Sequence, residues 1–190
     1  SALVDRPDDA VPDYSVTSFV TMDRFGGAVA CSVTMNAPFG VGRFAPGTGI
    51  IPGVAPTPES DGRISLAPML IVNKPTADAF LAAGASGDAS SPTSVISVVL
   101  KLLLDGKLLA EAVDAPRYHA GRTSRTVFAE ARANAVSTAQ FKAAGYRVIQ
   151  VPDLGRVNAI WCAKGIQEAS GECVYVADKR GFGYGVSVER

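Results

Sequence analysis

The sequence predicts an α+β fold in which layered antiparallel sheets pack with helices. The order of elements carries this prediction, because strand patterns come first, helical patterns follow, and strand patterns return. The 190 residues form one domain, or a large part of one, and a hydrophobic fraction of 47% allows a sizeable core. A charged fraction of 19% is typical of a globular chain rather than a disordered one.

A β-hairpin is expected near the start of the sequence. Residues 16–23 alternate and are rich in Val, Thr and Phe, an Arg-Phe-Gly-Gly turn follows, and residues 28–33 return. The return strand ends in Thr34 and Asn36, which share a face because they lie two residues apart. Fixed hydrogen-bonding groups at a strand end suit an active site. Residues 1–15 are expected to form an N-terminal arm or an inserted loop.

Glycine and proline separate the next elements. Residues 40–62 hold many of both, with little periodicity, and a loop of that length in a compact domain is usually functional. Apolar runs at 67–72 and 79–83 predict two strands. A helix is expected from its N-cap, Ser91, to about residue 105, before Gly106. It is apolar on nearly all sides, so burial is expected.

The second half of the chain predicts short helices and strands. One helix is expected at 108–114, and a capping box at 137–140 predicts another that closes at Gly145. Strands are expected at 125–129, 146–151, 157–162 and 172–177. The charged run 178–180 is expected to form a turn whose charges face solvent or an interface.

Composition excludes several classes of function. Zero net charge argues against a nucleic-acid or anionic-membrane surface. The longest apolar run, 95–104, is too short and too interrupted to span a bilayer. Three cysteines and one histidine lack metal-ligand spacing, so no metal site is expected. Cys31 and Cys162 are expected to be buried thiols, with a Cys162–Cys173 bridge as the weaker alternative.

Five segments carry a resemblance to a known family: GGAVACSVTMNAPFG with GTGI, SLAPMLIV, GASGDASSPTSVISVVLKLL, EAVDAPRYH and ADKRGFGYG. In this order and at these distances they resemble the small, catalytic subunit of the γ-glutamyltransferases, which are N-terminal-nucleophile (Ntn) hydrolases. The resemblance covers roughly residues 16–185. It implies a four-layer αββα sandwich, of which residues 1–190 would be the small-subunit half of a processed heterodimer.

The resemblance also implies a partner, a location and a chemistry. The partner is the large subunit of the same precursor, no metal or organic cofactor is implied, and relatives are mostly periplasmic or secreted. A Thr or Ser freed by autoproteolysis attacks a small-molecule amide, and its α-amine, with a pKa of about 7.7–8.0, takes the proton. Backbone N–H groups hold the oxyanion, and water or an acceptor amine resolves the acyl-enzyme.

Three residues match substrate-orienting positions of the family. Thr34 and Asn36 match its Thr-x-Asn, which supports the nucleophile and the substrate carboxylate; the alternative is that they only pack and cap a turn. Ser65 matches the second serine of a carboxylate-binding Ser-Ser pair, whose first member is Ile64 here. The family's acid-bearing loop for the glutamyl ammonium has no acid in residues 52–56. The resemblance therefore implies an amide substrate that is not strictly γ-glutamyl.

The oxyanion pair of the family falls on Gly87 and Asp88. Gly87 matches the first glycine of that pair, and Asp88 replaces the second. A backbone N–H remains at Asp88, although a carboxylate beside a developing oxyanion is unfavourable unless it points away. The alternative is that these two residues form a simple turn.

The largest departure from the family pattern concerns the nucleophile. The leading Thr-Thr-His of the family falls on Val16-Thr17-Ser18, so a valine stands at the expected position of the nucleophile. In the favoured hypothesis, cleavage occurs before Ser1, which acts as nucleophile and base, and residues 2–15 form an inserted loop. Closing such a loop costs only a few kcal/mol. In the second, the protein is a catalytically silent relative that binds or supports other molecules. In the third, Thr17 is the nucleophile through a one-residue slip, which would flip the faces of the strand.

Overall fold

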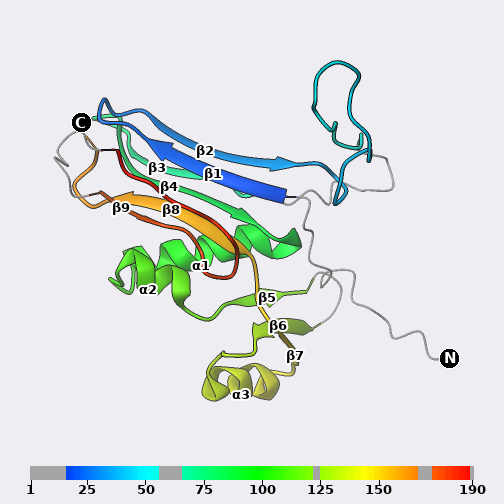
Figure 1. The fold of residues 1–190 in the computed structure, drawn as a ribbon. Helices are drawn as coiled ribbons and strands as arrows, with labels where there is room; N and C mark the ends of the chain where they lie inside the picture. Colours follow the sequence, from blue (N-terminus) through cyan, green and yellow to red (C-terminus); the bar gives the residue numbers. More distant parts are fainter. Residues whose placement is uncertain (1–15, 56–65, 122–124, 167–172, 189–190) are drawn as a thin grey trace.

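A computed structural model describes residues 16–55, 66–121, 125–166 and 173–188 in a mixed α+β fold (Figure 1). Its sheets have the strand orders β1-β2, β3-β4-β8-β9 and β5-β6-β7. The strands are β1 (Val16–Met22), β2 (Ala28–Thr34), β3 (Met69–Asn73), β4 (Asp78–Ser86), β5 (Tyr118–Ala120), β6 (Thr126–Glu130), β7 (Arg147–Val151), β8 (Arg156–Cys162) and β9 (Cys173–Val176). The helices are α1 (Ser91–Leu103), α2 (Leu109–Asp114) and α3 (Ala135–Ala143), and a 3₁₀ turn, η2 (Asp88–Ser90), precedes α1.

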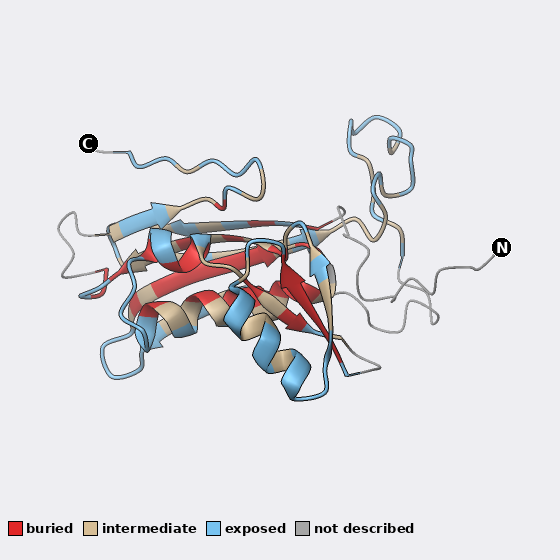
Figure 2. Ribbon diagram, turned by 90° about the horizontal axis from the view of Figure 1, so that it is seen from below, coloured by how far each residue is buried: buried red, intermediate tan, exposed pale blue. Residues whose placement is uncertain are grey.

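The four-stranded sheet is the middle of three layers. The β1-β2 hairpin packs on one face, against β4 and β8, and helices α1 and α2 cover the other face (Figure 1). Buried residues concentrate in these central strands and on the inner sides of the helices (Figure 2). The largest core cluster joins α1, α2, β4 and β8, and includes Leu81, Val95, Val98, Val113 and Val157. The α+β prediction is confirmed. Within the described residues, no helix covers the outer face of the hairpin.

The hairpin has the expected period and register. Val16 pairs with Thr34, and the pairing continues in register to the turn. Val16 and Ser18 are buried against the central sheet, whereas Thr17 between them is exposed on the outer face. A Cβ atom on Gly84 of β4 would lie 3.0 Å from the Ser18 Cβ, so the two layers approach closely here. The strand start is therefore fixed against β4.

Helix α1 differs from expectation at its start and on its surface. Its N-cap is Ser90, one residue earlier than predicted, and the Ser90 hydroxyl donates to the Gly87 carbonyl at 2.9 Å instead of capping the helix. The prediction that this helix is buried on all sides is also wrong for the described chain, because Ile96, Leu100 and Leu103 are about half exposed. The helix buries only the face that meets β4 and β8.

The third sheet and α3 also depart from the prediction. Asn134 is the N-cap of α3, and its side chain accepts from the Val136 N–H at 2.8 Å. The predicted capping box at 137–140 is wrong, because those residues lie inside the helix. Strand β5 was not predicted, and β6 and β7 pair in parallel rather than antiparallel because α3 connects them. This sheet lies at one side of the main sandwich (Figure 1).

The cysteines pair differently from the main expectation. Cys162 and Cys173 lie directly opposite each other in β8 and β9 and form a disulfide. The expected thiol at Cys162 is therefore wrong. Cys31 is a free cysteine as expected, but it is half-buried rather than buried. None of the described helices is long and apolar enough to cross a membrane. The described ranges hold no cluster of His, Cys, Asp and Glu side chains that could bind a metal ion.

Candidate active site

Three segments that carry candidate residues meet at one end of the sandwich. Val16, at the start of β1, pairs with Thr34 at the end of β2. Strand β4 runs to the same end and is followed by Gly87 (Figure 1). Thr17 and Ser86 line the same groove beside β1. The packing of the hairpin on β4 thus brings together residues that lie more than fifty positions apart in the sequence.

Thr34 and Asn36 form a tight corner after β2. The Thr34 hydroxyl accepts from the Asn36 backbone N–H at 2.9 Å. Asn36 has a φ of 57°, a left-handed conformation that asparagine tolerates better than most residues. Its Nδ2 donates to the Val54 carbonyl at 2.6 Å, while its buried Oδ1 has no hydrogen-bond partner in the described chain. The corner therefore has a structural role, and one of the two Nδ2 hydrogens of Asn36 is not used by Val54.

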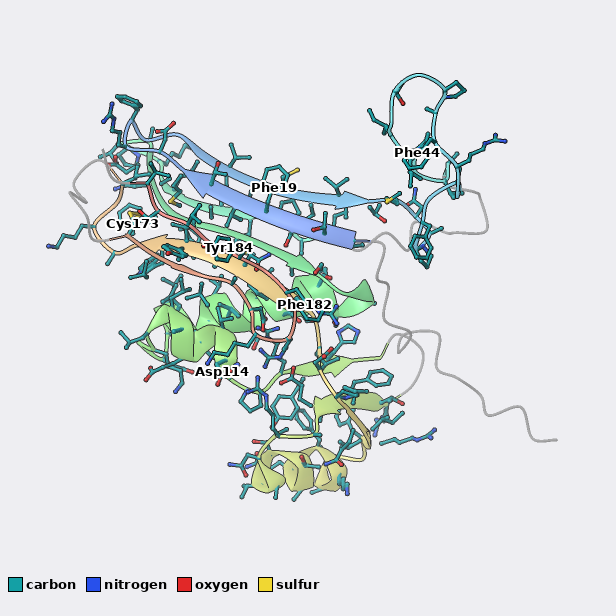
Figure 3. All side chains as sticks on the ribbon, in the orientation of Figure 1. Phe19, Phe44, Asp114, Cys173, Phe182 and Tyr184 are labelled. Carbon is teal, nitrogen blue, oxygen red and sulfur yellow. A yellow bond between two sulfur atoms is a disulfide. The ribbon has the colours of Figure 1, made fainter. Side chains whose placement is uncertain are left out.

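The segment that follows Asn36 folds back as a projecting loop (Figure 1). Val54 N–H donates to the Met35 carbonyl at 2.9 Å, and Val41 N–H donates to the Pro52 carbonyl at 2.9 Å. Residues 37–55 contain no Asp or Glu, so this loop supplies no carboxylate for a substrate ammonium. It instead exposes apolar side chains, including Phe44, which Figure 3 labels.

Gly87 lies in a turn that only glycine fits. Its φ is 109°, a region that side chains rarely adopt, and a Cβ atom there would lie 3.0 Å from the Gly155 Cα. The Ser90 hydroxyl holds the Gly87 carbonyl. The turn leads through η2 into α1, and the first N–H groups of a helix lack intrahelical partners and carry partial positive charge. The Gly87 turn therefore lies close to the positively polarised end of α1, while the Asp88 side chain lies outside the described part.

Two candidate residues lie outside the described ranges, and a third faces outward. Ser1 and Ser65 belong to the first group. Thr17 is described, and it lies on the exposed face of β1, opposite to Val16 and Ser18. The side chain at the strand start is the valine itself, which is buried and has no nucleophilic group.

A buried cluster of four charged residues lies beside this end of the fold. Arg117 Nη2 contacts Asp178 Oδ2 at 2.7 Å, and Arg180 Nε contacts Glu130 Oε1 at 2.6 Å. All four side chains are at most 6% exposed. The predicted solvent-facing or interface turn at 178–180 is therefore wrong for Asp178 and Arg180 within the described chain. No local pattern indicates this cluster, because its partners are 50 to 61 residues apart.

The arginines decide the ionisation of the cluster. Burial raises the pKa of Asp178, but the Arg117 charge and the hydrogen bond from Val157 N–H outweigh it, so the pKa lies below its ordinary value. Burial also raises the pKa of Glu130, and Arg180 reverses the effect in the same way. Both carboxylates are therefore ionised at neutral pH. The cluster is a balanced set of two anions and two cations.

A groove of about 560 Å³ runs along β1 and reaches Ser86, the residue before Gly87. It is lined by residues 17–22 of β1, by β8 and β9, and by the C-terminal segment 181–186. Phe182 and Tyr184 of this segment are almost fully exposed, and Phe19 of β1 is half exposed (Figure 3). Aromatic side chains are thus exposed both on β1 and on the C-terminal segment that lines the groove.

Comparison with known proteins identifies the family. The family model described as Gamma-glutamyltranspeptidase matches residues 55–187. This match begins after the hairpin, so the family assignment does not depend on the altered residues 16–18. A curated relative, Scoloptoxin SSD14 from Scolopendra dehaani, is 30% identical over 132 residues, which cover 58% of this chain and 23% of the relative. The chain thus spans about a quarter of the length of that relative.

Solved structures agree on the fold. The γ-glutamyltranspeptidase from Pseudomonas nitroreducens has a TM-score of 0.73 at 24% identity, over 91% of this chain and 100% of that chain. The Bacillus anthracis transpeptidase enzyme CapD has a TM-score of 0.70 at 19% identity, over 90% of this chain and 99% of that chain. With the family match over most of its residues, the chain belongs to the γ-glutamyltranspeptidase family of Ntn hydrolases and transferases.

Proposed function

We propose that this chain is the small-subunit half of an Ntn amidohydrolase or acyltransferase that works through an acyl-enzyme. The observation that carries this proposal is the meeting of the β1 start, Thr34 and the Gly87 turn at one end of the sandwich. Membership of the γ-glutamyltranspeptidase family supports the same reaction class. In this proposal residues 1–190 act as a single domain.

In the proposed mechanism, Ser1 supplies both nucleophile and base. Its hydroxyl oxygen bonds to the amide carbonyl carbon while its α-amine takes the hydroxyl proton. The carbonyl oxygen becomes an oxyanion that accepts from the N–H groups of Gly87 and Asp88. The C–N bond then breaks, the leaving amine takes the proton, and an ester remains on Ser1. Water or an acceptor amine attacks that ester and restores the free hydroxyl.

Thr34 would orient the nucleophile, and Asn36 and Ser65 would bind a substrate carboxylate. Asn36 retains an N–H that is not committed to Val54, which suits this role. Residues 37–55 lack an acid, so a substrate ammonium would be desolvated without a counter-charge. The proposed substrate is therefore an amide whose acyl group carries a terminal carboxylate but no α-ammonium, as in a glutaryl amide.

One observation favours a second function, that of a catalytically silent homologue. Val16 occupies the strand start, where the family carries its nucleophile, and it is buried. Thr17 is a poor substitute because its side chain lies on the opposite face of β1. In this alternative the chain keeps the fold and serves as a binding or structural protein.

The large subunit of the same precursor is the proposed partner. Exposed apolar side chains cover the outer face of the hairpin and the outer face of α1, and surfaces of this kind mark interfaces. They include Phe19, Val29, Val33, Ile96, Leu100 and Leu103. We also propose a periplasmic or secreted location, which the Cys162–Cys173 disulfide supports because such bonds persist in oxidising compartments.

Mapping the mature N-terminus tests the nucleophile. The full-length gene is expressed beside a Ser1→Ala variant and a control, Ser137→Ala, whose residue lies in α3 away from the site. We expect cleavage before Ser1 in the wild type and in Ser137→Ala, and an uncut chain in Ser1→Ala. An uncut wild-type precursor would support the silent homologue, and a start at Thr17 would replace Ser1 with Thr17.

Hydrolysis of two chromogenic amides tests the substrate class. Glutaryl-4-nitroanilide and γ-glutamyl-4-nitroanilide differ only in the α-ammonium. We expect kcat/KM to be higher for the glutaryl compound, because the described loop offers no carboxylate to the ammonium. A preference for the γ-glutamyl compound would contradict the proposed substrate while leaving the reaction class intact.

A further inference from the structure

We propose that Arg117 positions the oxyanion-binding turn at Gly87 by holding the Leu154–Gly155 corner that packs behind it. Arg117 is thereby assigned as a positioning residue for the reaction, not as a catalytic residue. The inference rests on the proposed function of the Gly87 turn. It depends on three contacts in sequence: Gly87 against the corner, the corner against Arg117, and Arg117 against Asp178.

The first contact is between two glycines. A Cβ atom on Gly87 would lie 3.0 Å from the Gly155 Cα, and a Cβ atom on Gly155 would lie 2.5 Å from the Ser94 Oγ. Gly155 also has a positive φ of 62°. The corner is therefore wedged between the Gly87 turn and helix α1, with no side chain to absorb a shift. A displacement of the corner is passed directly to the Gly87 backbone.

The second contact fixes the corner by its backbone groups. Arg117 Nη1 donates to the carbonyls of both Leu154 and Gly155, each at 3.0 Å. The Ser94 hydroxyl also donates to the Leu154 carbonyl, at 3.1 Å, and the Leu154 N–H donates to Glu130 Oε1 at 3.0 Å. Arg117, Glu130 and Ser94 are each at most 2% exposed. The corner is thus held by three buried side chains, and Arg117 makes two of the four bonds.

The third contact fixes Arg117 itself. Its Nη2 donates to Asp178 at 2.7 Å and to the Val113 carbonyl of α2 at 2.8 Å. The same Asp178 oxygen accepts from the Val157 N–H of β8 at 2.9 Å. A planar guanidinium can serve two sets of acceptors with two nitrogens, which a lysine ammonium cannot reproduce. The side chain therefore ties the corner to α2 and β8.

This arrangement predicts a specific kinetic signature. The oxyanion exists only in the transition state, so a misplaced Gly87 N–H weakens transition-state binding without weakening substrate binding. A misplacement of about 1 Å can cost on the order of 10²-fold in rate. Loss of the corner should therefore lower kcat and leave KM nearly unchanged.

The test compares two charge-neutral double variants in the complete processed protein. Arg117→Gln/Asp178→Asn removes the buried pair without leaving one charge uncompensated. The control, Asp105→Asn/Lys107→Gln, removes one anion and one cation that are both exposed, in the segment after α1. With glutaryl-4-nitroanilide, we expect kcat to fall about 10-fold to 100-fold in the first variant, with KM within about twofold of wild type. The control should match the wild type. An unchanged kcat, or a loss carried only by KM, would overturn the proposal.

Two further measurements keep the proposal falsifiable. Ser94→Ala leaves the charges in place and removes only one bond to the corner, so a smaller fall in kcat at constant KM is expected even if the double variant fails to fold. Amide hydrogen exchange of residues 86–90 requires no activity, and it should be faster in each folded variant of Arg117 or Ser94 than in the control. If the wild type hydrolyses no amide, the proposed function fails, and exchange at 86–90 alone decides the positioning: unchanged exchange would refute it.

Discussion

Replacing Glu130 with glutamine exposes how much of the fold depends on the buried charge cluster. Glu130 is fully buried, and both of its oxygens accept hydrogen bonds, from Arg180 at 2.6 and 2.8 Å and from Leu154 N–H at 3.0 Å. A glutamine keeps the shape but turns one oxygen into an NH₂ group, which then faces donors. Arg180 also loses one of its two carboxylate partners and keeps only Asp178, whose Oδ1 lies 3.1 Å from its Nη1. Removing one partner of a buried ion pair costs about 3–5 kcal/mol.

Thermal and urea unfolding of the processed protein measure this cost. For a chain of this size, about 3–5 kcal/mol corresponds to a fall in Tm of roughly 6–20 °C. The matched control is Asp114→Asn, which breaks an exposed ion pair with Arg132 at 3.3 Å and should cost no more than about 1 kcal/mol. The reasoning is refuted if Glu130→Gln unfolds within about 1 kcal/mol of the wild type, or if the two variants lose equal stability.

Three other predictions concern pH, redox state and the Gly87 turn. The pKa values of Asp178 and Glu130 are lowered in the fold, so these carboxylates bind protons more readily in the unfolded chain. Their contribution to stability is complete above their unfolded pKa values of about 4. It is lost as the pH falls further. A Tm that stays constant from neutral pH to well below pH 4 would contradict this. Reduction of the Cys162–Cys173 disulfide, which spans 11 residues, should lower the free energy of unfolding by about 3 kcal/mol. Calorimetry with and without dithiothreitol measures this loss. A Cys31→Ser variant should show the same loss on reduction as the wild type. Gly87→Ala should lower kcat and leave KM nearly unchanged, because the new Cβ must displace the Gly155 backbone. An unchanged kcat would argue against the oxyanion role.

Local periodicity was enough to predict the main strands, because the alternation of residue types along a strand reflects which side chains face the central sheet. The hairpin shows this: Val16 and Ser18 face inward and Thr17 faces outward, as a two-residue period requires. Cap positions were less predictable, since several polar residues compete for each. Ser90 occupies the N-cap position of α1 but donates its hydroxyl to the Gly87 carbonyl. Asn134 is the N-cap of α3, ahead of the expected capping box.

The surroundings of the candidate site were beyond local prediction. Arg117 and Asp178 are 61 residues apart, and nothing beside Asp178 in the sequence indicates that a buried arginine will face it. The approach of Gly155 to Gly87 likewise depends on how β8 enters the sheet beside β4. Apolar residues on every side of α1 predicted burial, yet among the described residues none covers its outer face; the proposed large subunit would cover it.

Trapping the acyl-enzyme tests the central claim most directly. The protein from the full-length gene is mixed with glutaryl-4-nitroanilide, quenched in acid during turnover, and mapped by peptide mass spectrometry. The proposed mechanism predicts a glutaryl ester on Ser1 that is absent from the Ser1→Ala variant and present in Ser137→Ala. Turnover with the acyl group on another residue, or without any acyl group on the chain, would contradict it.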